Sequence, residues 1–182
     1  SIGASAFARC SDLASVTIPN GVKSVGVNAF QKCTALTSLT LPKSVTSIGD
    51  GAFAYAANLK SVTLPANSVK LGMGAFYQAK SLKTINLEKV TEVGSVAFQG
   101  TAITNAVLSA DNVVIGEGAF YGQSHLQSVT LGDNAVIGDY AFSAEADDRG
   151  NVYTNLTTVT LLGDGVTVGE ASFMMCIMLE DF

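Results

Sequence analysis

The chain has 182 residues, of which 48 % are hydrophobic and only 14 % are charged, and its formal net charge is −5. A composition this apolar can bury a core, which excludes wholesale disorder, and its longest uninterrupted apolar run, seven residues at 173–179, is too short to cross a bilayer. The single histidine, His125, argues against a His-based hydrolase or metalloenzyme, and the acidic balance argues against nucleic acid as a partner.

A glycine followed four residues later by a phenylalanine recurs throughout the chain. Successive phenylalanines are separated by 23, 23, 23, 22, 22, 22 and 31 residues. The eight pairs are Gly3/Phe7, Gly26/Phe30, Gly49/Phe53, Gly72/Phe76, Gly94/Phe98, Gly116/Phe120, Gly138/Phe142 and Gly169/Phe173. A fixed period of this length predicts a stacked repeat architecture.

Residues 36–56 illustrate the elements of one repeat. Leu39 and Leu41 alternate with polar residues, as in a half-buried strand, and Pro42 ends the hydrogen-bonded ladder because it has no N–H. A second extended piece at 45–48 leads to Gly49, and a compact turn follows around Phe53. The turn is too short for a full helix, so a 3₁₀ or single α turn is expected.

Each repeat has one apolar side and must stack on its neighbours to bury it. Stacking predicts one continuous parallel sheet on one face, built from the Leu-x-Leu strands, and compact turns on the other. Residues 1–182 are therefore expected to form a single array of about 7–8 units. Because the pattern begins and stops in mid-unit, the chain is interpreted as a fragment of a larger protein.

The sequence Leu-x-x-Val/Leu-x-Leu-Pro, followed by Val-x-x-Ile-Gly-x-x-Ala-Phe-x-x-Cys-x-x-Leu, resembles the BspA-like (Treponema-type) leucine-rich repeat over essentially the whole chain. The resemblance implies a leucine-rich repeat solenoid, a right-handed superhelix of 22–23-residue repeats with short parallel strands. It further implies a cell-surface or secreted binding module, often an adhesin. Because fold does not determine function, the functional part of this expectation needs separate support.

The outward positions of the Leu-x-Leu strands carry mainly small hydroxyl or amide side chains. Such residues suit an exposed strand and satisfy one another across it, and they also offer a neutral hydrogen-bonding surface to a protein or glycan. Ice binding through regular hydroxyl rows is a remote alternative. The residues expected to contact a partner on this face are Ser15, Thr17, Ser38, Thr40, Ser61, Thr63, Ser128 and Thr130.

Charge divides the chain into two halves. Residues 1–89 contain nine basic and three acidic residues, a balance of +6, whereas residues 90–182 contain one basic and twelve acidic residues, a balance of −11. A division this large favours electrostatic steering of a partner, or head-to-tail packing of such chains, and predicts association that weakens with salt.

Two further segments are candidate contact surfaces. The interval between Phe142 and Phe173 contains an insertion near 143–155 with Glu145, Asp147 and Asp148, whose spacing matches no known calcium loop. Insertions in regular arrays are frequent binding sites. Near the last repeat, Met174, Met175 and Met178 occupy positions that are mostly polar or small elsewhere, which indicates an adaptable docking surface.

The residues that could carry chemistry have structural interpretations. Cys10, Cys33 and Cys176 each follow a repeat phenylalanine by three positions, which predicts small packing groups, with a Cys10–Cys33 disulfide as the alternative. Three cysteines scattered along the array cannot converge on zinc. His125 lies near Ser128 and Asp133 in sequence, but no motif supports a catalytic triad.

These patterns favour a non-catalytic protein–protein interaction module without metal or cofactor, either a surface adhesin segment or a scaffold subunit. A structural subunit packed into a larger assembly is the alternative, and glycan or ice binding is a remote one. The expected partner is a protein or a neighbouring subunit, with host and matrix proteins among the candidates. The expected location is the cell surface or the extracellular space, or otherwise an intracellular assembly.

Overall fold

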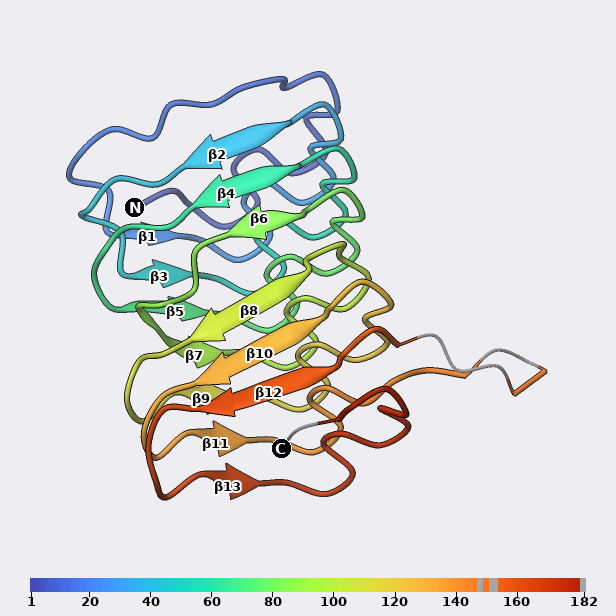
Figure 1. Cartoon of the computed structure of the whole chain (residues 1–182). Helices are drawn as coiled ribbons and strands as arrows, with labels where there is room; N and C mark the ends of the chain where they lie inside the picture. Colours follow the sequence, from blue (N-terminus) through green and yellow to red (C-terminus); the bar gives the residue numbers. More distant parts are fainter. Residues whose placement is uncertain (147–148, 151–153, 181–182) are drawn as a thin grey trace.

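The computed structural model describes residues 1–146, 149–150 and 154–180 and shows a solenoid of stacked coils (Figure 1). Short parallel strands alternate with tight turns, and the described residues contain no helix. Consequently none of the described segments forms a helix that could cross a membrane. The leucine-rich repeat solenoid expected from the sequence is confirmed.

One face of the solenoid is a continuous seven-stranded parallel sheet. Every strand pairs with its counterpart one coil away, as Val25 does with Ile48. In spatial order the strands are β1 (Ser24–Val25), β3 (Ser47–Ile48), β5 (Val69–Leu71), β7 (Val90–Val93), β9 (Val114–Ile115), β11 (Val136–Ile137) and β13 (Thr167–Val168). This sheet is built from the second, shorter extended piece of each repeat.

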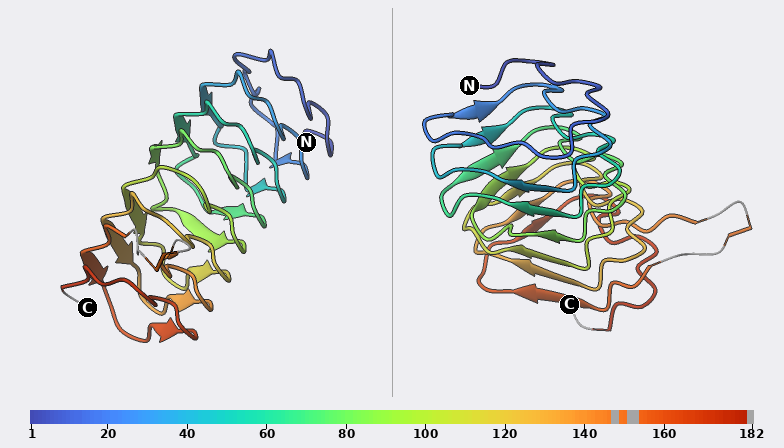
Figure 2. Two further views of the ribbon diagram at one scale, coloured as in Figure 1. Left: turned by 90° about the vertical axis from the view of Figure 1, so that its right-hand side faces the viewer. Right: turned by 90° about the horizontal axis from the view of Figure 1, so that it is seen from above.

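The Leu-x-Leu strands form two separate sheets, so the single continuous sheet expected from them is wrong. The first has the order β2 (Ser38–Thr40), β4 (Ser61–Thr63) and β6 (Thr84–Ile85). The second has the order β12 (Thr158–Leu161), β10 (Ser128–Leu131) and β8 (Asn105–Leu108). Figure 2 shows these strands and the seven-stranded sheet on two sides of the stacked coils.

The pairing of β6 with β4 ends early because of the Asn86 side chain. Asn86 accepts a hydrogen bond from the Leu64 amide at 2.7 Å and donates one to the Leu64 carbonyl at 3.1 Å. In the previous coil the Leu41 amide bonds the Thr63 backbone carbonyl, so beside Leu64 the Asn86 side chain takes the place of its own backbone, and β6 ends at Ile85.

A stack of phenylalanine rings runs along the turn side of the solenoid. Consecutive rings lie 5.0–5.5 Å apart between centroids and within 17° of parallel, from Phe7 to Phe173. Phe30, Phe53, Phe76, Phe98 and Phe120 are fully buried. Burying a ring of this size stabilises a fold by about 1.5–3 kcal/mol, so the stack is a major part of the core.

The turns around these rings are not the 3₁₀ or α turns expected from the sequence. In the coil of Phe53, the Ala52, Ala54 and Ala56 amides bond three residues back, but the Phe53 and Tyr55 amides bond carbonyls of the next coil. Two positions in most of these turns also adopt a left-handed backbone, as Gly51 (φ 59°) and Tyr55 (φ 60°) do here. Left-handed residues at both positions prevent a right-handed helical turn.

Candidate interaction surfaces

The structure places the predicted hydroxyl residues of the strand face outward. Ser38 pairs with Ser61 and Thr40 with Thr63 in one sheet, while Ser128 and Thr130 lie in the other. All of them, with Ser15 and Thr17, are exposed or half-buried. Ser15 and Thr17 are not in a strand, and the break between β6 and β8 divides the face.

Glu145, the first of the predicted contact residues in the insertion, is exposed. Asp147 and Asp148, the other two predicted contact residues of this segment, lie outside the described residues. Among the described residues, no group of three or more His, Cys, Asp or Glu side chains could hold a metal ion.

The three predicted methionines of the last coil are exposed, with exposed fractions of 45 % for Met174, 41 % for Met175 and 49 % for Met178. Ile177 beside them is 69 % exposed. These side chains form an apolar surface on a coil whose outer side no other described coil covers.

The cysteine column has a hydrogen-bonding role that the sequence did not reveal. The Cys33 thiol donates to the Phe7 carbonyl at 3.1 Å, and the Cys176 thiol donates to the Phe142 carbonyl at 3.2 Å. Gln123, at the same repeat position, donates to the Phe98 carbonyl. This column therefore satisfies a carbonyl of the preceding coil. All three cysteines are free thiols, so Cys10 and Cys33 are not joined by a disulfide.

The hydrogen bonds around His125 do not form a triad. Its Nδ1 lies 3.2 Å from the Ser124 hydroxyl, whereas the Ser128 hydroxyl donates to Asn105 at 2.7 Å. His125 is exposed, and the described residues place the Ser128 hydroxyl against the Asn105 amide rather than against a base that could activate it.

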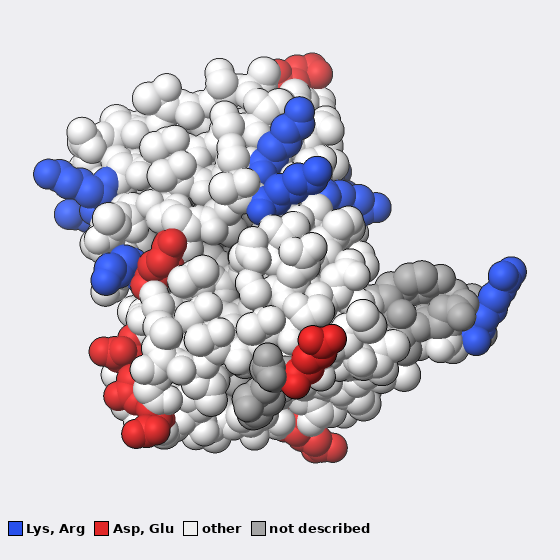
Figure 3. All heavy atoms as spheres, viewed as in Figure 1, with Lys and Arg blue, Asp and Glu red and all other residues white. Residues whose placement is uncertain are grey.

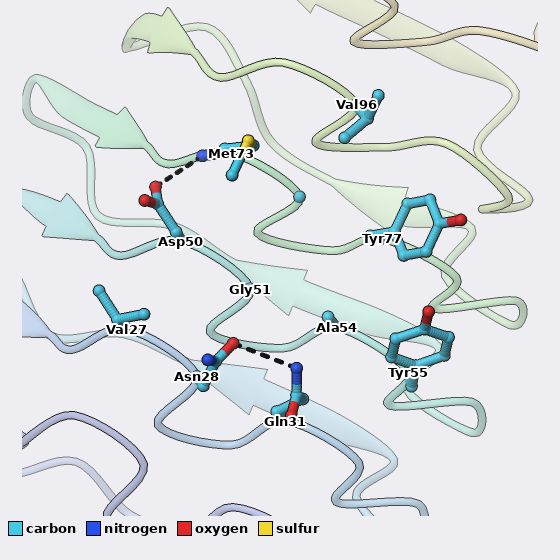
Figure 4. A pocket seen from close by; sticks show the side chains of 11 residues that line it. Val27, Asn28, Gln31, Asp50, Gly51, Ala54, Tyr55, Met73, Tyr77 and Val96 are labelled. Atoms are coloured by element: carbon cyan, nitrogen blue, oxygen red, sulfur yellow. Dashed lines mark hydrogen bonds between the residues drawn. The ribbon is translucent and has the colours of Figure 1, made fainter.

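An apolar groove on the turn side, which sequence analysis missed, is a further candidate site (Figure 4). It has a volume of about 410 Å³ and crosses several coils. Three of its large apolar side chains are well exposed: Val27 at 46 %, Tyr55 at 41 % and Met73 at 57 %. We refer to it as the Tyr–Met groove. Its lining residues are Val27, Asn28, Gln31, Asp50, Gly51, Ala54, Tyr55, Met73, Gly74, Tyr77 and Val96.

The side chains of the Tyr–Met groove are held by contacts between adjacent coils. The Tyr55 and Tyr77 rings meet edge to face at 5.4 Å, and the Lys32 ammonium lies 5.5 Å from the Tyr55 centroid. Asp50 accepts a hydrogen bond from the Met73 amide at 2.8 Å. These contacts place a polar rim of Asp50, Asn28 and Gln31 beside the apolar floor (Figure 4).

The sequence does carry a weak signal for this groove. Its aromatic and methionine residues occupy repeat positions that carry small or polar side chains in other units, such as Gln31 at the position of Tyr77. Which of these outward positions share a groove depends on the lateral packing of coils, which the repeat pattern alone does not specify.

The repeat match extends over nearly the entire chain. The sequence matches the BspA type leucine-rich repeat region in six copies, over residues 1–121 and 46–180. The chain belongs to the BspA-type leucine-rich repeat family. Leucine-rich repeat proteins are typically non-enzymatic scaffolds, and the fold is commonly used for protein–protein interaction.

Two solved structures of leucine-rich repeat proteins are similar to this solenoid. The Treponema pallidum leucine-rich repeat protein is 26 % identical, with a TM-score of 0.62, and the match covers 98 % of this chain and 70 % of that one. A leucine-rich repeat protein from Bacteroides ovatus is 22 % identical, with a TM-score of 0.47 and coverage of 98 % and 63 %. This chain thus spans less than two thirds of the Bacteroides protein. No curated protein matches it.

Proposed function

We propose that this chain is a non-catalytic protein-interaction module and that the Tyr–Met groove is its principal contact surface. The observation that carries the proposal is the exposure of Tyr55 and Met73 beside Tyr77 in a single groove. Tyrosine and methionine are enriched in protein interfaces, and binding energy concentrates on a few aromatic anchors inside a polar rim. The groove has both features.

The strand face, the insertion and the methionine surface are secondary contacts in this proposal. The hydroxyl side chains of the strand face can exchange hydrogen bonds with a partner, and Glu145 contributes negative charge at the insertion. A setting at the cell surface or outside the cell, as an adhesin segment, fits a family whose members are often surface-associated. A scaffold subunit would use the same surfaces.

A comparative capture experiment tests the principal contact. The chain, its Y55S/M73S variant and a V114S/V136S control are used as bait in extracts of the native source. Val114 and Val136 are 45 % and 41 % exposed on the seven-stranded sheet, so the control removes exposed apolar surface elsewhere. We expect a partner retained by the unmodified chain and the control but lost with Y55S/M73S. Equal retention by all three would overturn the groove as the contact surface.

Charge segregation favours a structural subunit as the second candidate function. Basic side chains lie mainly on the coils of the first half and acidic ones mainly on those of the second half (Figure 3). Opposite charge at the two ends would attract copies of the chain to each other. Sedimentation at low and high salt tests this candidate: self-association that disappears at high salt supports it, and a monomer under both conditions contradicts it.

A further inference from the structure

A notch on the strand side arises where one coil is a residue shorter than its neighbours. Six positions separate Phe76 from Leu82 and Phe120 from Leu126, but only five separate Phe98 from Ile103. Ala102 of the short coil is 6 % exposed, and its amide bonds the Leu82 carbonyl at 2.9 Å. The missing residue leaves a hollow of about 480 Å³ between the coils on either side.

The side chains around this notch are basic. Its lining consists of Lys60, Lys80, Ser81, Lys83, Ala102 and His125, without a carboxylate. In the part of the chain that the structure describes, none of these three lysines forms a salt bridge, and the ion pair found there joins Lys70 to Glu92. Figure 3 shows basic side chains gathered near the start of β4 and β6. The positive charge of the notch is therefore not neutralised within the described chain.

Two of these lysines occupy the same position on adjacent coils. The Lys83 amide donates to the Lys60 carbonyl at 3.0 Å, so the two side chains leave the backbone in one column. Coils in a parallel array are about 4.8 Å apart, and like charges directly opposite each other are destabilising. Thr37, the preceding member of the column, is uncharged, so the fold does not require lysine at this position.

We propose that this notch binds a polyanionic ligand through its sulfate or phosphate groups. Lysine ammonium groups bind such oxyanions as point charges, and the Ser81 hydroxyl and the His125 imidazole add donors. A single negative charge would neutralise only one of three ammonium groups, which favours a polyvalent ligand. A second hollow of about 220 Å³ at the break between β6 and β8 shares Lys83 but is also lined by Glu88, so the anionic groups are assigned to the notch and not to this hollow.

The single histidine makes the proposal directly testable by NMR. The His125 imidazole signals need no assignment, and they are followed while pyrophosphate or a polysulfated disaccharide is added. We expect a saturable shift with at least one probe. In K60Q/K83Q the Kd should rise roughly tenfold, as expected when charge-assisted contacts are removed. A matched K23Q/K43Q variant loses the same charge at exposed lysines outside the notch and should stay within about twofold of the unmodified chain.

The outcomes separate the alternatives. Saturation by only one probe supports the proposal and shows whether phosphate or sulfate groups are recognised, while saturation by both shows that the notch recognises the shared oxyanion chemistry. Absence of a saturable shift with both probes overturns the proposal. Equal weakening in the two double variants also overturns it, because the effect would then come from the general field of the basic half. A thermal melt of each variant verifies its folding.

Discussion

Gly94 passes so close to Gly72 on the preceding coil that a Cβ atom at Gly94 would lie 2.4 Å from the Gly72 carbonyl carbon. Real Cβ atoms essentially never approach another heavy atom this closely. The glycine of the Gly-x-x-x-Phe pattern is therefore required by the distance between stacked backbones. Stacking of identical positions at about 4.8 Å leaves no room for a side chain that points at the neighbouring coil.

Replacing Gly94 with alanine should destabilise the solenoid, because the obstructing atoms are backbone and cannot move aside cheaply. We expect a loss of about 1–3 kcal/mol in the free energy of unfolding, measured by urea denaturation. Gly3→Ala is the matched control, since a Cβ there would meet nothing within 4 Å. A loss in G3A equal to that in G94A would show that coil spacing is not the cause.

Val96 has a left-handed backbone (φ 51°) at a position where Gly51, Gly74 and Gly118 stand in other coils. A left-handed conformation costs a residue with a side chain about 1–2 kcal/mol. Val96→Gly should therefore leave stability unchanged or raise it by up to about 1 kcal/mol, despite the greater chain entropy of glycine. Val27→Gly is the control: Val27 also lines the groove, is not among the left-handed residues and should lose stability. Equal losses in calorimetry would contradict the strain at Val96.

The phenylalanine stack should be most sensitive at its middle. Phe76→Ala removes a fully buried ring with neighbours 5.5 Å away on both sides, for an expected loss of about 3–5 kcal/mol. Phe7→Ala removes a ring that is 39 % exposed and stacks on Phe30, so its loss should be clearly smaller. Denaturant titration of both variants measures the difference, and equal losses would contradict a stack that stabilises through burial.

Burial raises the pKa of the Cys33 thiol above its ordinary value of 9.0, and the nearby Cys10 adds to the rise. Because an unfolded Cys33 loses its proton at lower pH than a folded one, ionisation of this thiol favours the unfolded chain. The free energy of unfolding is therefore unaffected by this ionisation below pH 9.0 and declines as the pH rises through the raised pKa of the folded thiol. In mass-spectrometric alkylation near pH 8, exposed Cys10 should react first and Cys33 only after unfolding. Equal labelling rates in the folded chain would contradict the burial of Cys33.

The periodic spacing of glycine and phenylalanine was sufficient to predict stacked repeats, and the resemblance of the full repeat motif to BspA-like repeats indicated the family. The same buried positions recur in every repeat unit, so the core could be predicted from the sequence alone. The prediction was wrong where one unit departs from the repeat: the Leu-x-Leu sheet is divided between β6 and β8, next to the coil that is one residue shorter between Phe98 and Ile103. A repeat pattern describes what the units have in common and does not predict a feature that only one unit has.

The candidate sites were less predictable for a physical reason. The Tyr–Met groove combines residues from four coils, including Val27 and Val96, and depends on how neighbouring turns pack sideways. The basic notch depends on one missing residue between Phe98 and Ile103. The strand face, in contrast, follows from simple alternation, and its Ser and Thr residues do lie outward.

Site-specific photo-crosslinking tests the proposed interaction most directly. A photoreactive phenylalanine analogue replaces Tyr77, which lines the Tyr–Met groove, or as a control Val114 on the seven-stranded sheet. In the native source, we expect one protein partner to crosslink at position 77 and not at position 114, and the crosslink to disappear when Tyr55 and Met73 are also changed to serine. A partner that crosslinks at position 114 alone, or no crosslinked protein at position 77, would contradict the groove as the interaction surface.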